Sequence, residues 1–215
     1  MLTDVDLDNA DQQRFALHFD DLTTAHPTVP AAEGAPNVLP VGSENGKANH
    51  WHTDVTSVLN PPQASTLRSL VIPPYAGETL IANAATAYRD LPEALRDFAE
   101  ALWALHANDY DDAVPPQTVD EAERERRTEF ISIKYQTAHP IVRVHRLTGE
   151  RGLFVGGFAQ RIVGPVHRRV PGILRILQSY VTRPENVLRL RWAPHRITQH
   201  SPSTTTTTCR AGCTT

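Results

Sequence analysis

The sequence predicts an α+β protein built on an antiparallel β-sandwich, with a jelly roll as the candidate topology. Seventeen prolines, several of them in Pro-Pro pairs, divide the chain into many loops and favour β-structure over a helical bundle. Short strand-like segments lie between these loops, and only a few segments have a helical pattern. The length of 215 residues fits one domain, and 40% hydrophobic with 21% charged residues is ordinary for a globular chain.

Helical patterns occur in four segments. The first covers residues 8–19, with Asp8 or Asn9 placed to cap its start. The clearest begins at Asp90, which is placed as the cap of a helix with Pro92 in its first turn. Its core face is predicted from apolar residues at helical spacing: Leu91, Leu95, Phe98, Leu102 and Leu105. Two further helices are expected at 119–130 and 171–182.

Strands are expected at four places. The run 65–72 ends at a Pro-Pro pair, and three more apolar runs cover 140–145, 152–156 and 187–192. The stretch 27–49 is rich in Pro, Gly, Ala and Asn and is expected to be a loop.

Composition and charge restrict the class of protein. Both cysteines, Cys209 and Cys213, lie near the end of the sequence, so the body offers no disulfide or cysteine metal site. No apolar run reaches the roughly 18 residues of a membrane helix, and the acidic start differs from a basic signal. The net charge is −3, and the arginines between 143 and 191 are scattered among apolar residues. We expect a cytoplasmic protein that binds neither nucleic acid nor membrane.

The segment from Asn49 to Thr56 is the most informative in the chain. On an extended strand, residues i and i+2 point to the same side, so His52 and Asp54 could present an imidazole and a carboxylate to one ion. A distant histidine would complete the two-His-one-carboxylate triad of non-haem iron enzymes. His50 shares the face of His52, so spacing alone does not decide which imidazole is the ligand. The bare His-x-Asp pattern is also typical of a structural surface histidine.

The surrounding motifs closely resemble the taurine dioxygenase family and follow its order over residues 8–200. They are Trp51–Thr56, Pro73–Leu80, Ala82-Asn83, Ala87–Pro92, Leu102–His106, His139–His145, Leu153–Val155, Thr182–Asn186, Arg191-Trp192 and Thr198–His200. The details at 22–27 and 48–51 look most like the branch that oxidises alkyl sulfate esters. The resemblance implies an iron(II) and 2-oxoglutarate-dependent dioxygenase on a double-stranded β-helix (jelly roll) with flanking helices.

Four residues match the family's metal and cosubstrate positions. His52 and Asp54 match the first two iron ligands, and His200, in a Thr-Gln-His motif, matches the third. Thr79 matches the threonine whose hydroxyl binds a 2-oxoglutarate carboxylate. A simpler interpretation of Thr79 is that it ends a turn.

Two further residues match the family's substrate pocket. His26, in a His-Pro pair, matches a histidine that lines the sulfonate or sulfate pocket, and Phe158 matches an aromatic near it. The implied reaction uses O2 to convert 2-oxoglutarate into succinate and carbon dioxide, and hydroxylates the carbon that bears sulfate or sulfonate. The product collapses to an aldehyde and releases sulfate or sulfite. Whether the chain forms a homo-oligomer is left open.

Three departures from the family pattern bear on activity. Family members begin with further strands, and the strand before Thr-Gln-His is missing where Trp192-Ala193-Pro194 runs into His195. We divide the chain into a taurine dioxygenase-like domain at 1–200 and an aberrant Thr-rich tail at 201–215, which looks like neither a strand nor family sequence. The tail reads as the family's tail after one base is lost from its coding DNA.

The family's tail carries the arginine that pairs with the far carboxylate of 2-oxoglutarate. Arg210 is near this position in sequence but is not assigned to it. We therefore expect a chain with these departures to fold poorly or to bind 2-oxoglutarate weakly. One alternative to an active enzyme is an inactive remnant that acts at most as a binding or interaction protein. Another is a generic metal-binding module that needs no 2-oxoglutarate.

Overall fold

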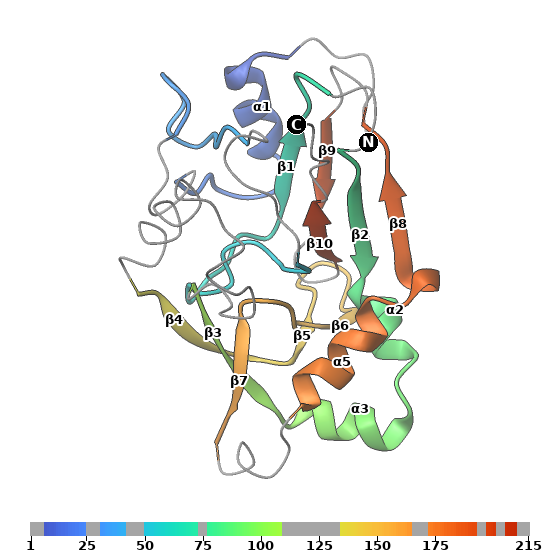
Figure 1. Ribbon diagram of the computed structural model, residues 1–215. Helices are drawn as coiled ribbons and strands as arrows, with labels where there is room; N and C mark the ends of the chain where they lie inside the picture. The colour runs from blue at the N-terminus through green and yellow to red at the C-terminus, as the bar shows by residue number, and fades with distance from the viewer. Residues whose placement is uncertain are drawn as a thin grey trace, which may run out of the picture.

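Antiparallel pairing between segments far apart in the chain organises the fold (Figure 1). The computed structural model describes residues 7–24, 31–41, 50–72, 77–108, 134–164 and 172–192, together with the backbone of 197–200 and 205–209. Strand β1 (Ser65–Arg68) pairs with β9 (Ile197–His200). Strand β2 (Thr79–Asn83) lies between β8 (Val187–Leu190) and β10 (Thr205–Cys209). Late strands that return onto early ones in this way are typical of a jelly roll.

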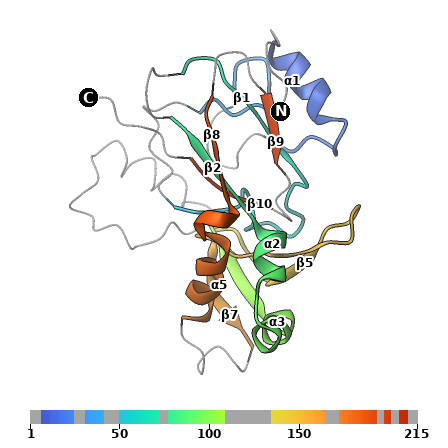
Figure 2. The same cartoon turned by 90° about the vertical axis from the view of Figure 1, so that its right-hand side faces the viewer.

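The remaining strands and three helices lie below this group of strands in Figures 1 and 2. The middle strand β3 (Trp103–Ala107) pairs with β4 (Gln136–Pro140) and with β7 (Ala159–Val163), and β5 (Val142–Val144) forms a hairpin with β6 (Arg151–Leu153). The helices are α2 (Ala84–Arg89), α3 (Glu93–Glu100) and α5 (Ile173–Val181), and a short 3-10 helix, η3 (Pro184–Asn186), leads into β8. None of the helices in the described ranges has the length and apolar character that crossing a membrane requires.

The hydrophobic core joins these helices to the strands beside them. Its buried side chains include Ala87, Leu91, Ala99, Leu102, Ala104, Leu153, Leu177 and Val181. Asn83 starts α2, because its side-chain oxygen accepts the N–H groups of Ala85 and Thr86, each at 3.0 Å. This cap fixes the direction in which the chain leaves β2.

The first helix, α1 (Asn9–Ala16), is capped as the sequence predicts. The Asp8 side chain accepts the N–H of Asp11, and Asp11 accepts the N–H of Asp8 in return. Arg68 of β1 donates to the Leu7 carbonyl and, at 2.6 Å, to the side chain of Asn9. The helix is therefore held against β1, although it is shorter than the predicted range 8–19.

The long helix predicted from Asp90 is wrong in its cap and in its second half. Asp90 ends α2, and α3 begins after Pro92 with no side-chain cap. The chain then turns at Leu102 into β3, where buried Leu102, Ala104 and His106 alternate with less buried neighbours. Leu102 and Leu105 continue the helical spacing of the leucines before them, although the helix has already ended at Glu100, which is why the pattern misled. The strand β4 was likewise not predicted in full, since the expected strand began only at 140.

The Thr-rich tail was expected to form no strand, and this is also wrong. Residues 205–209 form β10, which pairs antiparallel with β2 from Thr205 opposite Asn83 to Cys209 opposite Thr79. Threonine is β-branched and favours extended backbone, so a run of threonines can add a strand to an available edge. The predicted helix at 119–130, Arg210, and residues 27–30 and 42–49 of the predicted loop lie outside the described residues.

Candidate functional site

The side chains of His52 and Asp54 converge near the first residue of β1, Ser65. The His52 Nε2 atom lies 3.3 Å from Asp54 Oδ1, so the two side chains meet on one side of the chain. The residue that follows, Val55, has a φ of 54°, an unusual value for a β-branched residue. The two side chains therefore meet where the chain leaves its extended course, whereas the sequence predicted the meeting on a regular strand.

The imidazole of His52 lies between two hydrogen-bond acceptors. Its Nδ1 is 3.0 Å from the His50 carbonyl, which only accepts, so Nδ1 carries a hydrogen and Nε2 faces the carboxylate. Burial works to lower the pKa of His52, but the hydrogen bond and charge of Asp54 outweigh it and raise the pKa. A neutral ring would place its Nε2 lone pair against a carboxylate oxygen. Either a proton on Nε2 or a divalent cation relieves that repulsion, so this donor pair fits a metal ion.

Ser65 connects Asp54 to the third predicted ligand. Its hydroxyl donates to Asp54 Oδ2 at 3.1 Å, and its backbone lies directly opposite His200 in the β1–β9 ladder. Directly opposite positions of an antiparallel pair belong to the same face of the sheet. Among the residues whose side chains are described, no cluster of three or more His, Cys, Asp or Glu could hold a metal ion. The side chain of His200 is outside that set, so its role as a ligand stays a prediction.

Two glycines that were not predicted to belong to the site allow residues 50–52 to pack against the chain after β6. Gly157 donates its N–H to the Trp51 carbonyl at 2.8 Å. A Cβ at Gly157 would come within 2.6 Å of His50 Cδ2, and one at Gly156 within 3.2 Å of His52 Cα. The Gly-Gly pair after the buried run 153–155 was the available signal, because adjacent glycines often mark a close backbone approach.

Phe158 lies against both histidines of the motif. Its ring stands edge-on to His52 at 5.8 Å between centroids and to His50 at 6.5 Å. The sequence predicted an aromatic near the substrate pocket at this position, and the structure brings it beside the candidate metal ligand. His26 lies outside the described residues.

Thr79 starts β2 and is buried, with 3% of its surface exposed. The indole Nε1 of Trp192 donates to its hydroxyl oxygen at 2.8 Å. Thr79 also lies opposite Leu190 of β8 and Cys209 of β10. It is therefore an ordered, enclosed hydroxyl rather than the end of an exposed turn.

A charged face lies on the other side of β8. Arg189 and Arg191 both bind the carboxylate of Glu78, the latter at 2.9 Å. The hydrogen bond and charge of Arg189, followed by those of Arg191, hold the pKa of Glu78 below its usual value. Side chains alternate along a strand, so these arginines are on the face opposite to buried Leu190 and Thr79. Both arginines therefore bind Glu78 on the face away from the Thr79 hydroxyl.

Two buried histidines lie beneath the motif and were missed as a pair. His139 Nε2 lies 3.0 Å from the carbonyls of Thr56 and of Val58, and His106 Nδ1 lies 2.9 Å from the Thr56 hydroxyl. The two rings meet edge to face at 5.2 Å, and Phe154 stacks on His106. They anchor the segment that follows Asp54 to β3 and β4. No local pattern links residues so far apart in sequence.

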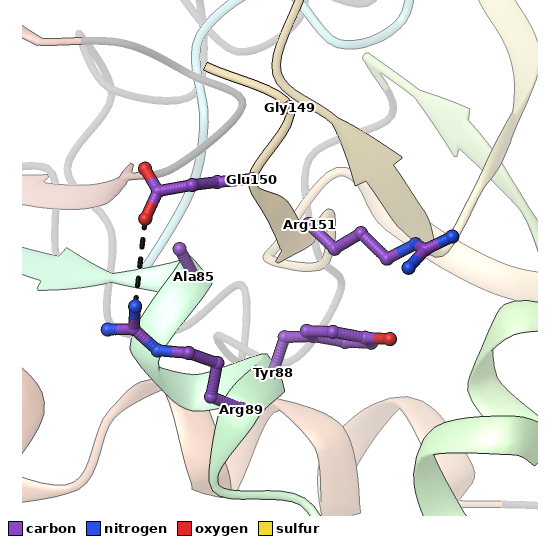
Figure 3. A pocket seen from close by; sticks show the side chains of 6 residues that line it. All are labelled: Ala85, Tyr88, Arg89, Gly149, Glu150 and Arg151. Carbon is purple, nitrogen blue, oxygen red and sulfur yellow. Dashed lines mark ion pairs between the residues drawn. The ribbon is translucent and has the colours of Figure 1, made fainter.

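A separate pocket lies between α2 and the loop before β6 (Figure 3). It is lined by Ala85, Tyr88, Arg89, Gly149, Glu150 and Arg151. Arg89 and Glu150 face each other across it at 3.6 Å, so their charges are mutually neutralised. The pocket includes none of the residues predicted to act in chemistry.

Residues 1–198 match the model of the family described as "Taurine catabolism dioxygenase TauD, TfdA family". The chain belongs to this taurine dioxygenase family. It is 44% identical over 203 residues to an alpha-ketoglutarate-dependent sulfate ester dioxygenase of Pseudomonas putida and to an alkylsulfatase of Acinetobacter baylyi. These matches cover 90% of this chain but only 67% and 64% of the two relatives.

The taurine dioxygenase fold is confirmed by a solved structure. A taurine dioxygenase from Burkholderia xenovorans superposes with a TM-score of 0.78 at 32% identity, over 97% of this chain and 68% of that chain. The family and the jelly-roll class predicted from the motifs are therefore both confirmed. The assignment of individual site residues stays a prediction.

Proposed function

We propose that this chain carries the active site of an iron(II) and 2-oxoglutarate-dependent dioxygenase that acts on a sulfate ester or a sulfonate. The observation that supports it best is the meeting of His52 and Asp54 at 3.3 Å, with Ser65 joining Asp54 to the strand position of His200. The substrate class comes from the two relatives at 44% identity, a sulfate ester dioxygenase and an alkylsulfatase.

His52, Asp54 and His200 would hold the metal ion. Iron(II) supplies the oxygen chemistry when bound, because a facial triad leaves three positions for a cosubstrate and O2. The His50 carbonyl fixes the ring nitrogen of His52 that faces the ion, and Ser65 fixes one oxygen of Asp54. Such hydrogen bonds to the ligands orient them and tune their basicity.

Thr79 and Phe158 would position the two organic molecules. The Thr79 hydroxyl can donate to a carboxylate of 2-oxoglutarate, and burial around it strengthens that bond. Phe158 provides an apolar edge beside His52, which limits the water that reaches the reacting carbon. His26 would meet the sulfur oxyanion as the family resemblance implies. We propose a cytoplasmic location, since the cysteines lie only at 209 and 213.

Turnover tests this function directly. The purified chain is supplied with ferrous iron, 2-oxoglutarate, O2 and either an alkyl sulfate or taurine. Each cycle should consume one 2-oxoglutarate and one O2 and yield succinate, carbon dioxide, an aldehyde and one sulfate or sulfite. The Asp54→Ala variant should form neither succinate nor sulfur oxyanion. Succinate formation that is equal in the variant and the parent chain would contradict the proposal.

A further inference from the structure

We propose that Trp192 is a positioning residue that makes the Thr79 hydroxyl a hydrogen-bond donor toward the 2-oxoglutarate carboxylate. This inference rests on the proposed function, because it concerns the cosubstrate that Thr79 would bind. Trp192 itself would not touch the reacting atoms.

The register of β2 and β8 brings the two side chains together. Thr79 lies opposite Leu190, and Trp192 follows two residues later on the same face of the chain. Its Nε1 reaches Thr79 Oγ1 at 2.8 Å. Both are at least partly buried, so this hydrogen bond is protected from competing water.

The direction of that hydrogen bond decides what Thr79 can do. An indole N–H only donates, so the Thr79 oxygen must act as the acceptor. The single hydrogen of the hydroxyl is then directed away from the indole. A carboxylate only accepts, so a threonine that binds it must donate. Trp192 therefore holds the hydroxyl in the orientation that carboxylate binding requires and polarises it in that direction.

The two arginines of this part of the chain do not provide this orientation. Arg189 and Arg191 lie on the opposite face of β8, where both bind Glu78. The outer face of β8 therefore carries the charged groups, and on its inner face Trp192 supplies a neutral hydrogen-bond donor to Thr79. Loss of the indole N–H should thus affect Thr79 without changing the charge around it.

A double-mutant cycle on 2-oxoglutarate binding tests the inference. Calorimetry with the full chain and Mn(II), which binds without turnover, gives Kd for 2-oxoglutarate in the parent, Trp192→Phe, Thr79→Val and the double variant. Trp192→Phe should raise this Kd about three- to tenfold, as expected for a lost hydrogen bond, and leave the Kd of Mn(II) unchanged. The double variant should bind no more weakly than Thr79→Val alone. Trp103→Phe, on an exposed tryptophan, is the matched control and should have no effect.

The outcomes separate this inference from the function it rests on. If Thr79→Val weakens binding and Trp192→Phe does not, or if the two effects add, the role of Trp192 is wrong while the cosubstrate site stands. If Thr79→Val has no effect, both the cosubstrate assignment and the inference fail. A second measurement needs no substitution and so avoids misfolding. In NMR spectra of the parent chain, the indole N–H resonance of Trp192 should shift when 2-oxoglutarate binds. An unmoved resonance would overturn the inference.

Discussion

Ser65 lies directly opposite His200 in the β1–β9 ladder, while its hydroxyl donates to Asp54 at 3.1 Å. One small residue therefore connects the two ends of the proposed metal site, which are far apart in sequence. Its backbone fixes the register of the distant histidine, and its side chain orients the carboxylate.

Replacing Ser65 by alanine should weaken metal binding. The variant keeps the backbone ladder but removes the hydrogen bond to Asp54, and losing such a supporting bond typically costs about 10–100-fold in metal affinity. Titration with Mn(II) measures the change. Thr66→Ala, at the next position on the opposite face of β1, is the matched control and should bind Mn(II) like the parent chain. Equal losses in both variants would mean that Ser65 matters only for the strand.

The two histidines of the motif should differ sharply. His52→Ala removes the ring that meets Asp54, so metal binding should fall to the level of Asp54→Ala. His50→Ala removes a ring but keeps the backbone carbonyl that accepts from His52 Nδ1, so most metal affinity should remain. Calorimetric titration with Mn(II) compares the two. A larger loss in His50→Ala than in His52→Ala would exchange their roles.

Part of the site could be predicted from sequence because it depends on local geometry. The i, i+2 spacing brings His52 and Asp54 to one side, and the order of motifs along the chain predicted the fold. The details of the backbone were not predictable. Leu102 and Leu105 continue a helical spacing, but the buried residues after α3 are Ala104 and His106, whose alternation belongs to the strand β3.

Contacts between distant segments were beyond the reach of local patterns. The approach of Gly156 and Gly157 to the motif, and the contact of His106 and His139 with Thr56, depend on packing between elements. A single histidine in a strand pattern gives no sign of the partner it will meet. For the same reason, the Thr-rich tail offered no sign of the β2 edge with which it pairs.

Alanine at Gly156 should disturb the metal site more than alanine at Gly149. Both glycines have positive φ, 142° and 73°, so both variants suffer backbone strain of about 1–3 kcal/mol. Only at Gly156 would the new Cβ also crowd backbone, at 3.2 Å from His52 Cα. Urea unfolding and Mn(II) titration should therefore separate the two: both lose stability, and Gly156→Ala alone loses metal affinity. A comparable loss of affinity in Gly149→Ala would contradict this account of the packing.

Acid should destabilise the fold through His106. Burial, followed by the charges of His139 and Arg143, lowers the pKa of His106 to about 3 from 6.5. Burial also lowers the pKa of His139. The unfolded chain therefore binds a proton between these values while the folded chain resists it, and stability falls as pH decreases through that window. For His106 alone the loss between pH 7 and pH 5 is about 2 kcal/mol.

Urea midpoints measured from pH 7 to pH 5 test this assignment. His106→Asn keeps a partner for the Thr56 hydroxyl but has no titrating ring, so its stability should fall less steeply with acid. The exposed His18→Gln is the matched control and should follow the parent chain. If His106→Asn and the parent chain have the same slope against pH, the acid sensitivity comes from other groups.

Proline substitutions in the tail should reveal the pairing of β10 with β2. Thr206 lies opposite Ala82 and Thr207 opposite Ile81, and β10 is paired on one side only in its sheet. Along such a strand, successive N–H groups point alternately toward the partner and away from it. Proline removes an N–H, so one of Thr206→Pro and Thr207→Pro should lose a ladder hydrogen bond of about 1 kcal/mol and the other should be tolerated better. For a chain of this size the difference is about 2–4 °C in Tm.

Because Cys209 lies opposite Thr79, the more damaging variant should also raise the Kd for 2-oxoglutarate. Equal, negligible effects of the two prolines on Tm would mean that the Thr-rich tail does not pair with β2 in solution.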